Sequence, residues 1–452
     1  MKKIFTVMIS SCCLGTSFHG VASAEALTAT EKINDSGMTL TMSLPQVIDS
    51  ALKNNVLKRL AHERINAAKA RKTQDRADLL PHFTAGASQT RTYWDNYAAA
   101  GFPDFGVVGP YNSFDARVYL VARVFDLGAF SKLKAADLDI VISRLQDDLA
   151  QDQITVSAAL SYLDVLSAGE RLRAIDQDIL LARETVQLAD HQLQAGIVTR
   201  LDLVRAKTKL AQESARRLAI LEYFQAARLQ LARITGMPMG SSIMLSESLR
   251  FYEEPILSAE NAIKEAFKNR LEMAMADRKL EYRQVELSKA NRARLPVVDL
   301  TGNYGRSGIE PHEQAHDAAQ IGMRVSMPIF EGGLIAGQIK ESQSQKAQEE
   351  IQKEDMRTQV EEDVRLAVQV METSTSQVKA AQEELDLAME QERLAKDEYA
   401  DGLANNIELI DAHTVLERAR ESYVTVLAKY HMTRVNYYSA IGRIKAFHLN
   451  HI

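Results

Sequence analysis

The sequence predicts a mostly helical chain made of two copies of one unit, in which each copy carries two strands that contribute to a membrane β-barrel. Three observations predict this. The chain repeats its motifs a second time in the same order, its two longest helical segments carry an apolar heptad pattern, and four segments alternate between apolar and polar residues. Sustained heptads specify coiled-coil packing, and alternating strands of ~10 residues are typical of membrane barrels. We therefore expect the order helix, strand, strand, long helical hairpin, used twice.

Residues 1–24 have the features of a secretory signal peptide, because a lysine pair precedes an apolar run and the motif ASA ends the segment. Both cysteines, Cys12 and Cys13, lie within it, so we expect a mature protein without disulfides. In the alternative interpretation ISS-Cys12 is a lipoprotein box and Cys12 is acylated. Residues 25–43 are expected to form an N-terminal periplasmic segment.

Composition argues against several classes of protein. The 54 basic and 60 acidic residues leave a net charge of −6, which gives no support for a nucleic-acid partner. No apolar run after the signal approaches the ~18 to 20 residues of a membrane-spanning helix, so a membrane could be crossed only by a closed β-barrel. No catalytic motif, nucleotide-binding loop or metal ligand set emerges, and we expect neither enzyme activity nor a cofactor.

The two copies are repeat 1, residues 44–236, and repeat 2, residues 258–444. Their opening helices, VIDSALKN and AIKEAFKN, align, and both copies close on a glycine, Gly236 and Gly442. Each opening helix is expected to run unbroken to the first strand and to complete the second side of a helical rod. Between and after the copies we expect a linker and a C-terminal tail, at 237–257 and 445–452.

A heptad seam runs through the long helix of each copy for nearly six heptads. Many of its positions are alanine, which allows close approach of helices. Glu392 is a polar seam residue that either sets the register or faces water. The seam positions are Ile154, Ala158, Ser161, Val165, Ala168, Leu172, Ile175, Ile179, Ala182, Val186, Ala189 and Leu193 in repeat 1, and Val360, Val364, Ala367, Met371, Ser374, Val378, Ala381, Leu385, Ala388, Glu392, Ala395 and Tyr399 in repeat 2.

The long helix of each copy ends at a repeated turn, QAGIVTRLDLVRAKTKL in repeat 1 and ADGLANNIELIDAHTVL in repeat 2, where Gly196 aligns with Gly402. A continuous helix from Gly128 to Ala195 would be on the order of 100 Å long at ~1.5 Å per residue. No compact globule contains such an element.

Four strands are predicted at about 82–92, 114–125, 297–306 and 320–330. In 320–330 every second residue is apolar, and in 114–125 arginines alternate with apolar residues. This pattern suits lipid on one face and water on the other, although a soluble sheet with one buried face would show the same alternation. Four strands cannot close a membrane barrel, for which about eight is the minimum, so three chains supplying twelve strands are expected.

These motifs resemble the TolC family of bacterial outer-membrane channel proteins over about residues 40–444. The resemblance rests on LPQVIDSALKNN, the Leu-Pro before the first strand of each copy, MPIFEGG, the paired glycine turns, and the closing ITGMP and AIGRI. Repeat 1 departs from the pattern at Arg123, where repeat 2 has Pro328.

The resemblance implies a homotrimer in the outer membrane lipid, with a twelve-stranded β-barrel continued by a twelve-helix coiled-coil barrel across the periplasm. A periplasmic adaptor and an inner-membrane transporter would deliver cargo to this passive exit duct, and the sequence does not distinguish drug efflux, metal efflux and protein secretion. The competing hypothesis is a soluble periplasmic coiled-coil scaffold or adaptor.

Two acidic residues, Glu408 and Asp411, are three apart and share a helix face. The resemblance implies that in a trimer they form a carboxylate constriction that gates the pore and favours cations, with pKa values raised by crowding. On the residues alone, acids in a first helical turn also favour the helix dipole.

The resemblance also implies a hydrogen-bonded latch between Asp202 and Tyr399 at the tip. The basic residue that the family can use two positions after the glycine is replaced by Ala404, for which Arg200 is a candidate substitute. The turns themselves are the expected adaptor contact, although they could be turns without a partner: Gly196, Ile197, Val198, Thr199, Gly402, Leu403, Ala404 and Asn405.

Overall fold

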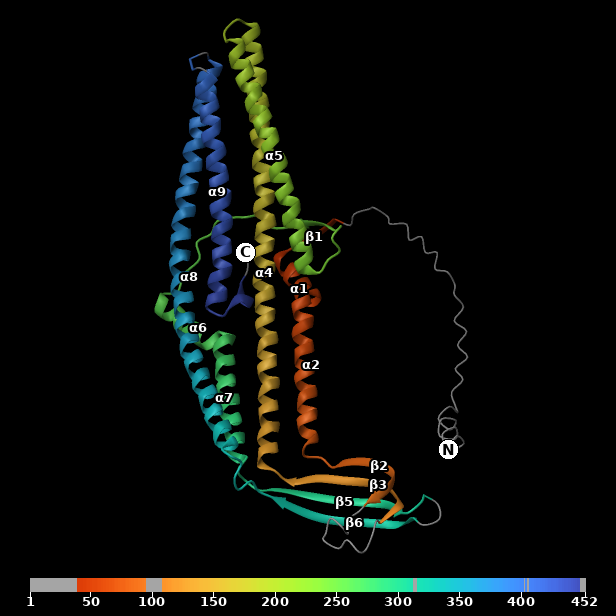
Figure 1. Cartoon of the computed structure of the whole chain (residues 1–452). Helices are drawn as coiled ribbons and strands as arrows, with labels where there is room; N and C mark the ends of the chain where they lie inside the picture. Colours follow the sequence, from red (N-terminus) through yellow and green to blue (C-terminus); the bar gives the residue numbers. More distant parts are fainter. Residues whose placement is uncertain (1–38, 95–107, 312–314, 402, 405, 448–452) are drawn as a thin grey trace, which may run out of the picture. The chain divides into compact units, whose positions relative to one another are not determined.

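The computed structural model describes residues 39–447 except 95–107, 312–314, 402 and 405 (Figure 1). The predicted signal peptide with Cys12, residues 25–38 of the N-terminal segment and residues 448–452 of the tail lie outside the described residues.

Two long helical hairpins dominate the described chain. The first hairpin pairs α4 (Leu127–Gln194) with α5 (Arg200–Thr235), and the second pairs α8 (Leu334–Ala400) with α9 (Asn406–Ala440) (Figure 1). Every predicted seam position in α4 and α8 is buried or half-buried, so the heptad prediction is confirmed. Because α4 follows strand β3 directly and ends at the first turn, the strands and that turn lie at opposite ends of the same helix.

The opening helix of each copy is divided in two, which the sequence analysis did not predict. Repeat 1 has α1 (Leu44–Asn54) and α2 (Val56–Ala77), and repeat 2 has α6 (Ala259–Asn269) and α7 (Leu271–Arg292). As expected, α2 packs along α4 and α7 along α8, while α7 also contacts α4.

The breaks are fixed by the ends of the return helices. The side chain of Asn55 donates to the Ile234 carbonyl of α5 at 3.0 Å and accepts from Leu57 N at 2.9 Å, so it caps the end of α5 and the start of α2. Gly236 ends α5 with φ +69, and a Cβ there would lie 2.6 Å from the Cβ of Asn54. Glycine is therefore required at this contact by both conformation and space.

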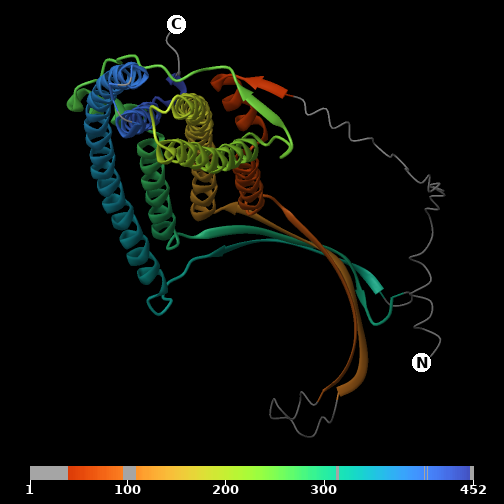
Figure 2. The same cartoon turned by 90° about the horizontal axis from the view of Figure 1, so that it is seen from above.

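The four long strands form one antiparallel sheet in the order β2 (His82–Trp94), β3 (Val108–Phe125), β5 (Val297–Gly308) and β6 (Ala315–Ser326). Figure 2 shows that this sheet curves strongly. The register separates two faces. Ala122, Leu300 and Met323 lie side by side on one face, and the next row on the other face contains Arg123, Asp299 and Arg324. Within the described residues, β2 and β6 are the two edges of the sheet.

The last strand begins and ends earlier than predicted. It ends at Ser326, while the alternating apolar pattern continues to Phe330. Pro328 lacks the backbone N–H that a ladder needs, and Ile329 is 96% exposed beyond the strand end. The alternation of apolar residues therefore continues for four residues after the last residue of the hydrogen-bonded strand.

The predicted linker takes part in the fold, since its strand β4 (Ser242–Leu245) pairs in parallel with β1 (Thr39–Met42). Further along, Glu254 forms an ion pair with Arg434 of α9, which is 1% exposed. The predicted tail is also bound in its described part, because Phe447 is buried and its ring lies 5.2 Å from the Arg434 guanidinium. Linker, tail and α9 thus meet at one arginine.

None of the helices in the part of the chain that the structure covers has an apolar stretch sufficient to cross a bilayer.

Candidate functional site at the hairpin turns

The turn of the first hairpin reverses the chain at a left-handed glycine. Gly196 has φ +73, and Ile197 N donates to Gln192 O at 2.8 Å, which satisfies a carbonyl left free at the end of α4. A Cβ at Gly196 would meet nothing within 4 Å, so here glycine is required by conformation alone.

The second hairpin repeats this hydrogen bond at the equivalent residues. Leu403 N donates to Glu398 O at 2.9 Å, and Ala404 N donates to the same carbonyl at 3.2 Å. Gly402 and Asn405, which were also predicted as turn residues, lie outside the described residues. Ile197 and Leu403 occupy equivalent places and are 65% and 81% exposed.

Asp202 is engaged at the start of α5. Its carboxylate accepts from Thr199 N at 3.0 Å and from Thr199 Oγ1 at 2.7 Å. The first of these bonds forms a capping box together with the bond that Asp202 N donates to Thr199 Oγ1 at 3.4 Å. Hydrogen bonding to Thr199, with a smaller contribution from the charge of Arg205, holds the pKa of Asp202 below its usual value. The carboxylate is therefore ionised and held within its own turn.

Tyr399 lies at the same tip but does not hydrogen-bond to Asp202 in this structure. Its ring is 1% exposed, and its hydroxyl is buried without a hydrogen-bond partner among the described residues. Burial raises the pKa of the Tyr399 hydroxyl, and the negative charge of Asp202 adds to the effect. Arg200, the candidate basic substitute, is exposed at the first residue of α5.

The two hairpins are instead joined through backbone carbonyls of the two predicted latch residues. Gln192 Nε2 of α4 donates to the carbonyl of Tyr399 at 3.2 Å, and Asn406 Nδ2 of α9 donates to the carbonyl of Asp202 at 2.8 Å. Gln192 is 7% exposed and Asn406 is 2% exposed. Neither amide was predicted from the sequence. A signal was available for Asn406, since it aligns with the charged Arg200 of the other copy.

Glu408 and Asp411 are both exposed and lie one helical turn apart near the start of α9. Leu409 and Ala412, each next to one of the acids in sequence, are 1% exposed and face the protein. The two carboxylates therefore point away from the packed side of the second hairpin, on a surface that no other part of the described chain covers.

A groove of about 400 Å³ lies between the hairpins next to the turns. It is bounded by residues 204–212 of α5 and by the start of α9, with apolar residues on both sides and cationic residues from α5. This surface was not predicted, because it depends on how the two hairpins lie together. Its lining residues are Val204, Arg205, Thr208, Lys209, Gln212, Ile407 and Ile410.

Within the described ranges, no group of three or more His, Cys, Asp or Glu side chains is arranged to hold a metal ion. The chemistry available at the turns is thus that of a surface, with exposed carboxylates, exposed apolar side chains and an open groove.

One sequence family and two individual proteins that match this chain are all described as outer-membrane or secretion proteins. The sequence model of one family, described as Outer membrane efflux protein, matches residues 47–237 and 262–443. The chain is 23% identical to Outer membrane protein TolC of Escherichia coli K12 over 98% of this chain and 87% of that protein. It is 21% identical to the Alkaline protease secretion protein AprF of Pseudomonas aeruginosa, over 84% of this chain and 81% of the relative.

The fold is also similar to that of a solved structure, the CmeC outer membrane channel of Campylobacter jejuni. The TM-score is 0.79 at 20% sequence identity, over 90% of this chain and 87% of that one.

Proposed function

The chain belongs to the outer membrane efflux protein family, and from this membership we propose that three copies of it form an outer-membrane duct, the passive exit of a tripartite efflux or type I secretion system. The resemblance to the TolC family that the sequence motifs predicted is thereby confirmed. We assign the duct no catalytic role, and its energy would come from an inner-membrane transporter acting through a periplasmic adaptor.

The observation that carries the proposal is the sheet with two faces and two open edges at the far end of α4 from its turn. One face presents Ile321, Met323 and Val325, which are 78%, 69% and 66% exposed in the single chain. Such a face suits lipid, and the opposite face, with Asp299 and Asn303, suits a water-filled lumen. Pairing β2 of one copy with β6 of the next would give three copies twelve strands and leave no free edge.

The helical turns would then form the periplasmic end of the duct. Three copies of Glu408 and Asp411 would place six carboxylates around the axis. A carboxylate ring at a constriction favours cations over anions, and we assign these residues to the gate.

The latch would act through the backbone. We propose that the closed tip is held by the bonds from Gln192 to the Tyr399 carbonyl and from Asn406 to the Asp202 carbonyl. This keeps Asp202 and Tyr399 as latch residues, with their carbonyl oxygens in place of the hydrogen bond between side chains.

An adaptor would dock on the turns. The exposed Ile197 and Leu403, with Gly196, Val198, Thr199 and Ala404, would supply the rim of the contact, and the groove between α5 and α9 would receive an apolar helical element of the partner. Gly402 and Asn405 belong to the same proposed surface.

Membrane fractionation and planar-bilayer recording test the duct. We expect the mature protein in the outer-membrane fraction as a detergent-stable trimer that forms ion-conducting pores. Recovery in the soluble periplasmic fraction without pore activity would instead identify a soluble coiled-coil scaffold.

A further inference from the structure

The contact between α5 and α9 differs from the other helix contacts of the two hairpins. Apolar packing joins the helices within each hairpin, as where Ala189 packs against Leu203 and Ala206 in the first. Apolar packing also joins α4 to α9, where Ile154 and Val435 belong to one cluster. Between α5 and α9, from Lys209 on the wall of the groove to Glu421 further from the turns, ion pairs join the two helices. This polar contact is separate from the turns and from the proposed gate.

The ion pairs converge on Lys209 of α5. Its Nζ lies 2.7 Å from Glu417 Oε2 of α9 and 2.8 Å from Glu213 Oε1 of its own helix. Arg420 of α9 pairs with Asp178 of α4 at 2.7 Å. We call the following set the charged layer: Asp178, Lys209, Glu213, Arg216, Glu417, Arg420 and Glu421, where Arg216 also pairs with Glu421.

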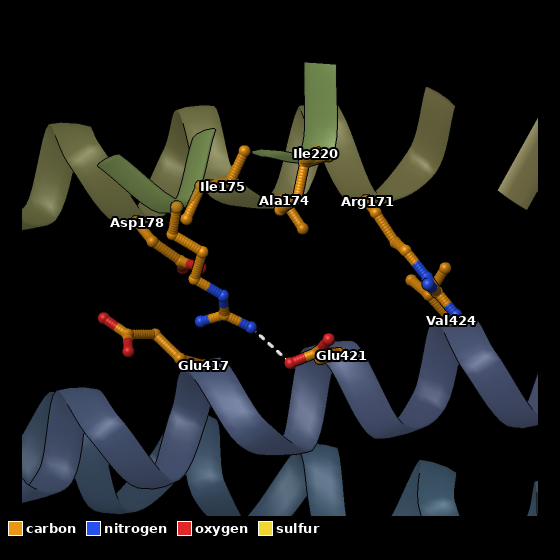
Figure 3. Close-up of a pocket in the computed structure, with 9 residues that line it drawn as sticks. Arg171, Ala174, Ile175, Asp178, Ile220, Glu417, Glu421 and Val424 are labelled. Carbon is orange, nitrogen blue, oxygen red and sulfur yellow. Dashed lines mark hydrogen bonds and ion pairs between the residues drawn. The ribbon is translucent and has the colours of Figure 1, made fainter. Parts of the chain in front are cut away.

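Three carboxylates of the layer are shielded from water, while Glu421 at its edge is exposed. Glu213, Asp178 and Glu417 are 3%, 5% and 6% exposed. In Figure 3, Asp178 on α4 and Glu417 and Glu421 on α9 surround a small cavity of about 20 Å³, enough for roughly one water molecule. Burial raises the pKa of Asp178 and of Glu417, against the lowering by their cationic partners.

Buried ion pairs add little net stability compared with apolar packing, but losing one partner is costly because the other charge stays buried. Where ion pairs take the place of apolar side chains, separation of the two surfaces exposes less apolar area, because water solvates each charge again. An interface of this kind is therefore strong when complete and reversible when it opens.

The layer is specific to one contact. The residues that align with Lys209, Glu213 and Glu417 in the other copy, 206 positions away, are Val415, Ala419 and Ala211. The reversed contact, in which the second hairpin of one chain would meet the first hairpin of another chain, therefore lacks these charges. These charges are therefore not a feature that both copies of the repeated unit share.

We propose that the charged layer is a second lock of the duct, which holds the second hairpin against the first while the channel is closed and lets the intact hairpins move apart when it opens. The inference rests on the proposed function, and it places a locking contact above the tip, on side chains that do not touch the pore constriction.

Single-channel recording of Lys209→Met in the full-length protein tests the lock. The variant leaves Glu213 and Glu417 buried without their cation, so the fraction of open channels should rise by about tenfold or more, a change of about 1.4 kcal/mol in the closed-to-open equilibrium. The exchange Lys209→Glu/Glu417→Lys keeps one cation among the same carboxylates and should return the open fraction towards that of the original protein. If Lys209→Met does not assemble, Glu417→Gln, which keeps the side-chain shape, should show a smaller increase.

The matched control is Lys353→Met, which removes a 2.6 Å ion pair with Asp277 between α8 and α7 where both side chains are exposed. It should leave the open fraction unchanged. A trimeric Lys209→Met or Glu417→Gln that conducts like the original protein, or a Lys353→Met with the same increase, overturns the lock. Absence of any pore in the original protein overturns the proposed function instead.

Discussion

At the scale of single residues, the tip shows how polar side chains can join two hairpins without an ion pair. Gln192 and Asn406 each donate an amide N–H to a backbone carbonyl of the other hairpin. Their amide oxygens, Gln192 Oε1 and Asn406 Oδ1, stay buried without a hydrogen-bond partner among the described residues. Unsatisfied buried oxygens weaken the closed arrangement. Because these amide oxygens lack hydrogen bonds in the closed arrangement, the contact between the two hairpins should break at a lower cost in free energy.

The carboxylates of the proposed gate give a prediction about ion selectivity. Glu408→Ala/Asp411→Ala should lower the cation-over-anion permeability ratio several-fold and weaken block by divalent cations, because the ring loses its negative charge. Reversal potentials in a salt gradient measure the ratio. Glu383→Ala/Glu384→Ala removes two exposed carboxylates from the middle of α8 and serves as the control. Equal selectivity in the gate variant and the original protein would refute the assignment.

A buried histidine predicts how the stability of the fold depends on pH. His413 of α9 is 7% exposed, and burial lowers its pKa to about 4, helped by the charges of Lys396, Lys209 and Arg420. The charge of Glu184 acts in the opposite direction, and burial with the three cations outweighs it. Glu392 Oε1 also faces the histidine, 3.6 Å from Nε2.

Between pH 6.5 and 4 the unfolded chain therefore binds a proton at this histidine that the folded chain does not, so stability falls as the pH falls. The loss from pH 7 to pH 5 should be on the order of 2 kcal/mol per chain. Thermal unfolding of His413→Gln at both pH values should show a smaller acid loss than the original protein. His191→Gln, at an exposed position near the first turn, should show the full loss. Equal acid losses in both variants would contradict the prediction.

At the scale of elements, the helix breaks are tertiary features. No proline or glycine is present around Asn55, and the local signal is limited to a residue type that favours helix caps. The break is fixed by the bond from Asn55 to the Ile234 carbonyl of α5, far along the chain. The heptad seams were predictable because a period repeated over nearly six heptads averages out local exceptions. The end of β6 was not, because apolar alternation reports which face a residue occupies and does not report hydrogen bonding.

The closing glycine gives a graded prediction for the helix junction. Gly240→Ala should be nearly neutral, because its φ is not positive and a Cβ there would meet nothing within 4 Å. Gly196→Ala should cost about 1–2 kcal/mol for its left-handed conformation. Gly236→Ala adds the clash with Asn54 and should cost about 2–5 kcal/mol. Chemical unfolding of the three variants measures the order, and equal costs at Gly196 and Gly236 would argue against the close contact.

At the scale of the whole molecule, the linker and the C-terminal segment are tied to the second copy through Arg434. Its guanidinium lies 4.3 Å from the ring centre of Tyr252 and pairs with Glu254, both in the predicted linker. The sequence suggested a free connection here because proline, glycine and serine gather at 237–257. The packing of the linker depends on the buried Arg434, and it could not be predicted because arginine is usually found on the surface.

Replacing Arg434 tests this junction. Arg434→Met should destabilise the protein by about 3–5 kcal/mol because Glu254 stays buried without its cation. Arg434→Met/Glu254→Gln should recover most of the loss, and Arg418→Met, at an exposed position of the same helix, should stay within about 0.5 kcal/mol of the original protein. Thermal unfolding of the purified protein decides, and a neutral Arg434→Met would show that the junction does not depend on the ion pair.

The uncharged counterparts of Lys209, Glu213 and Glu417 also bear on the symmetry of the assembly. A subunit with one hairpin, assembled six-fold, would have to carry both the cation and its carboxylates on every copy. A chain with two hairpins is free of that constraint, so it can carry Lys209 on one hairpin and Glu417 on the other. In the proposed trimer, neighbouring hairpins then meet through two unlike contacts in alternation, and the mouth of the duct would widen with three-fold symmetry, at the three contacts within the chains that the charged layer closes.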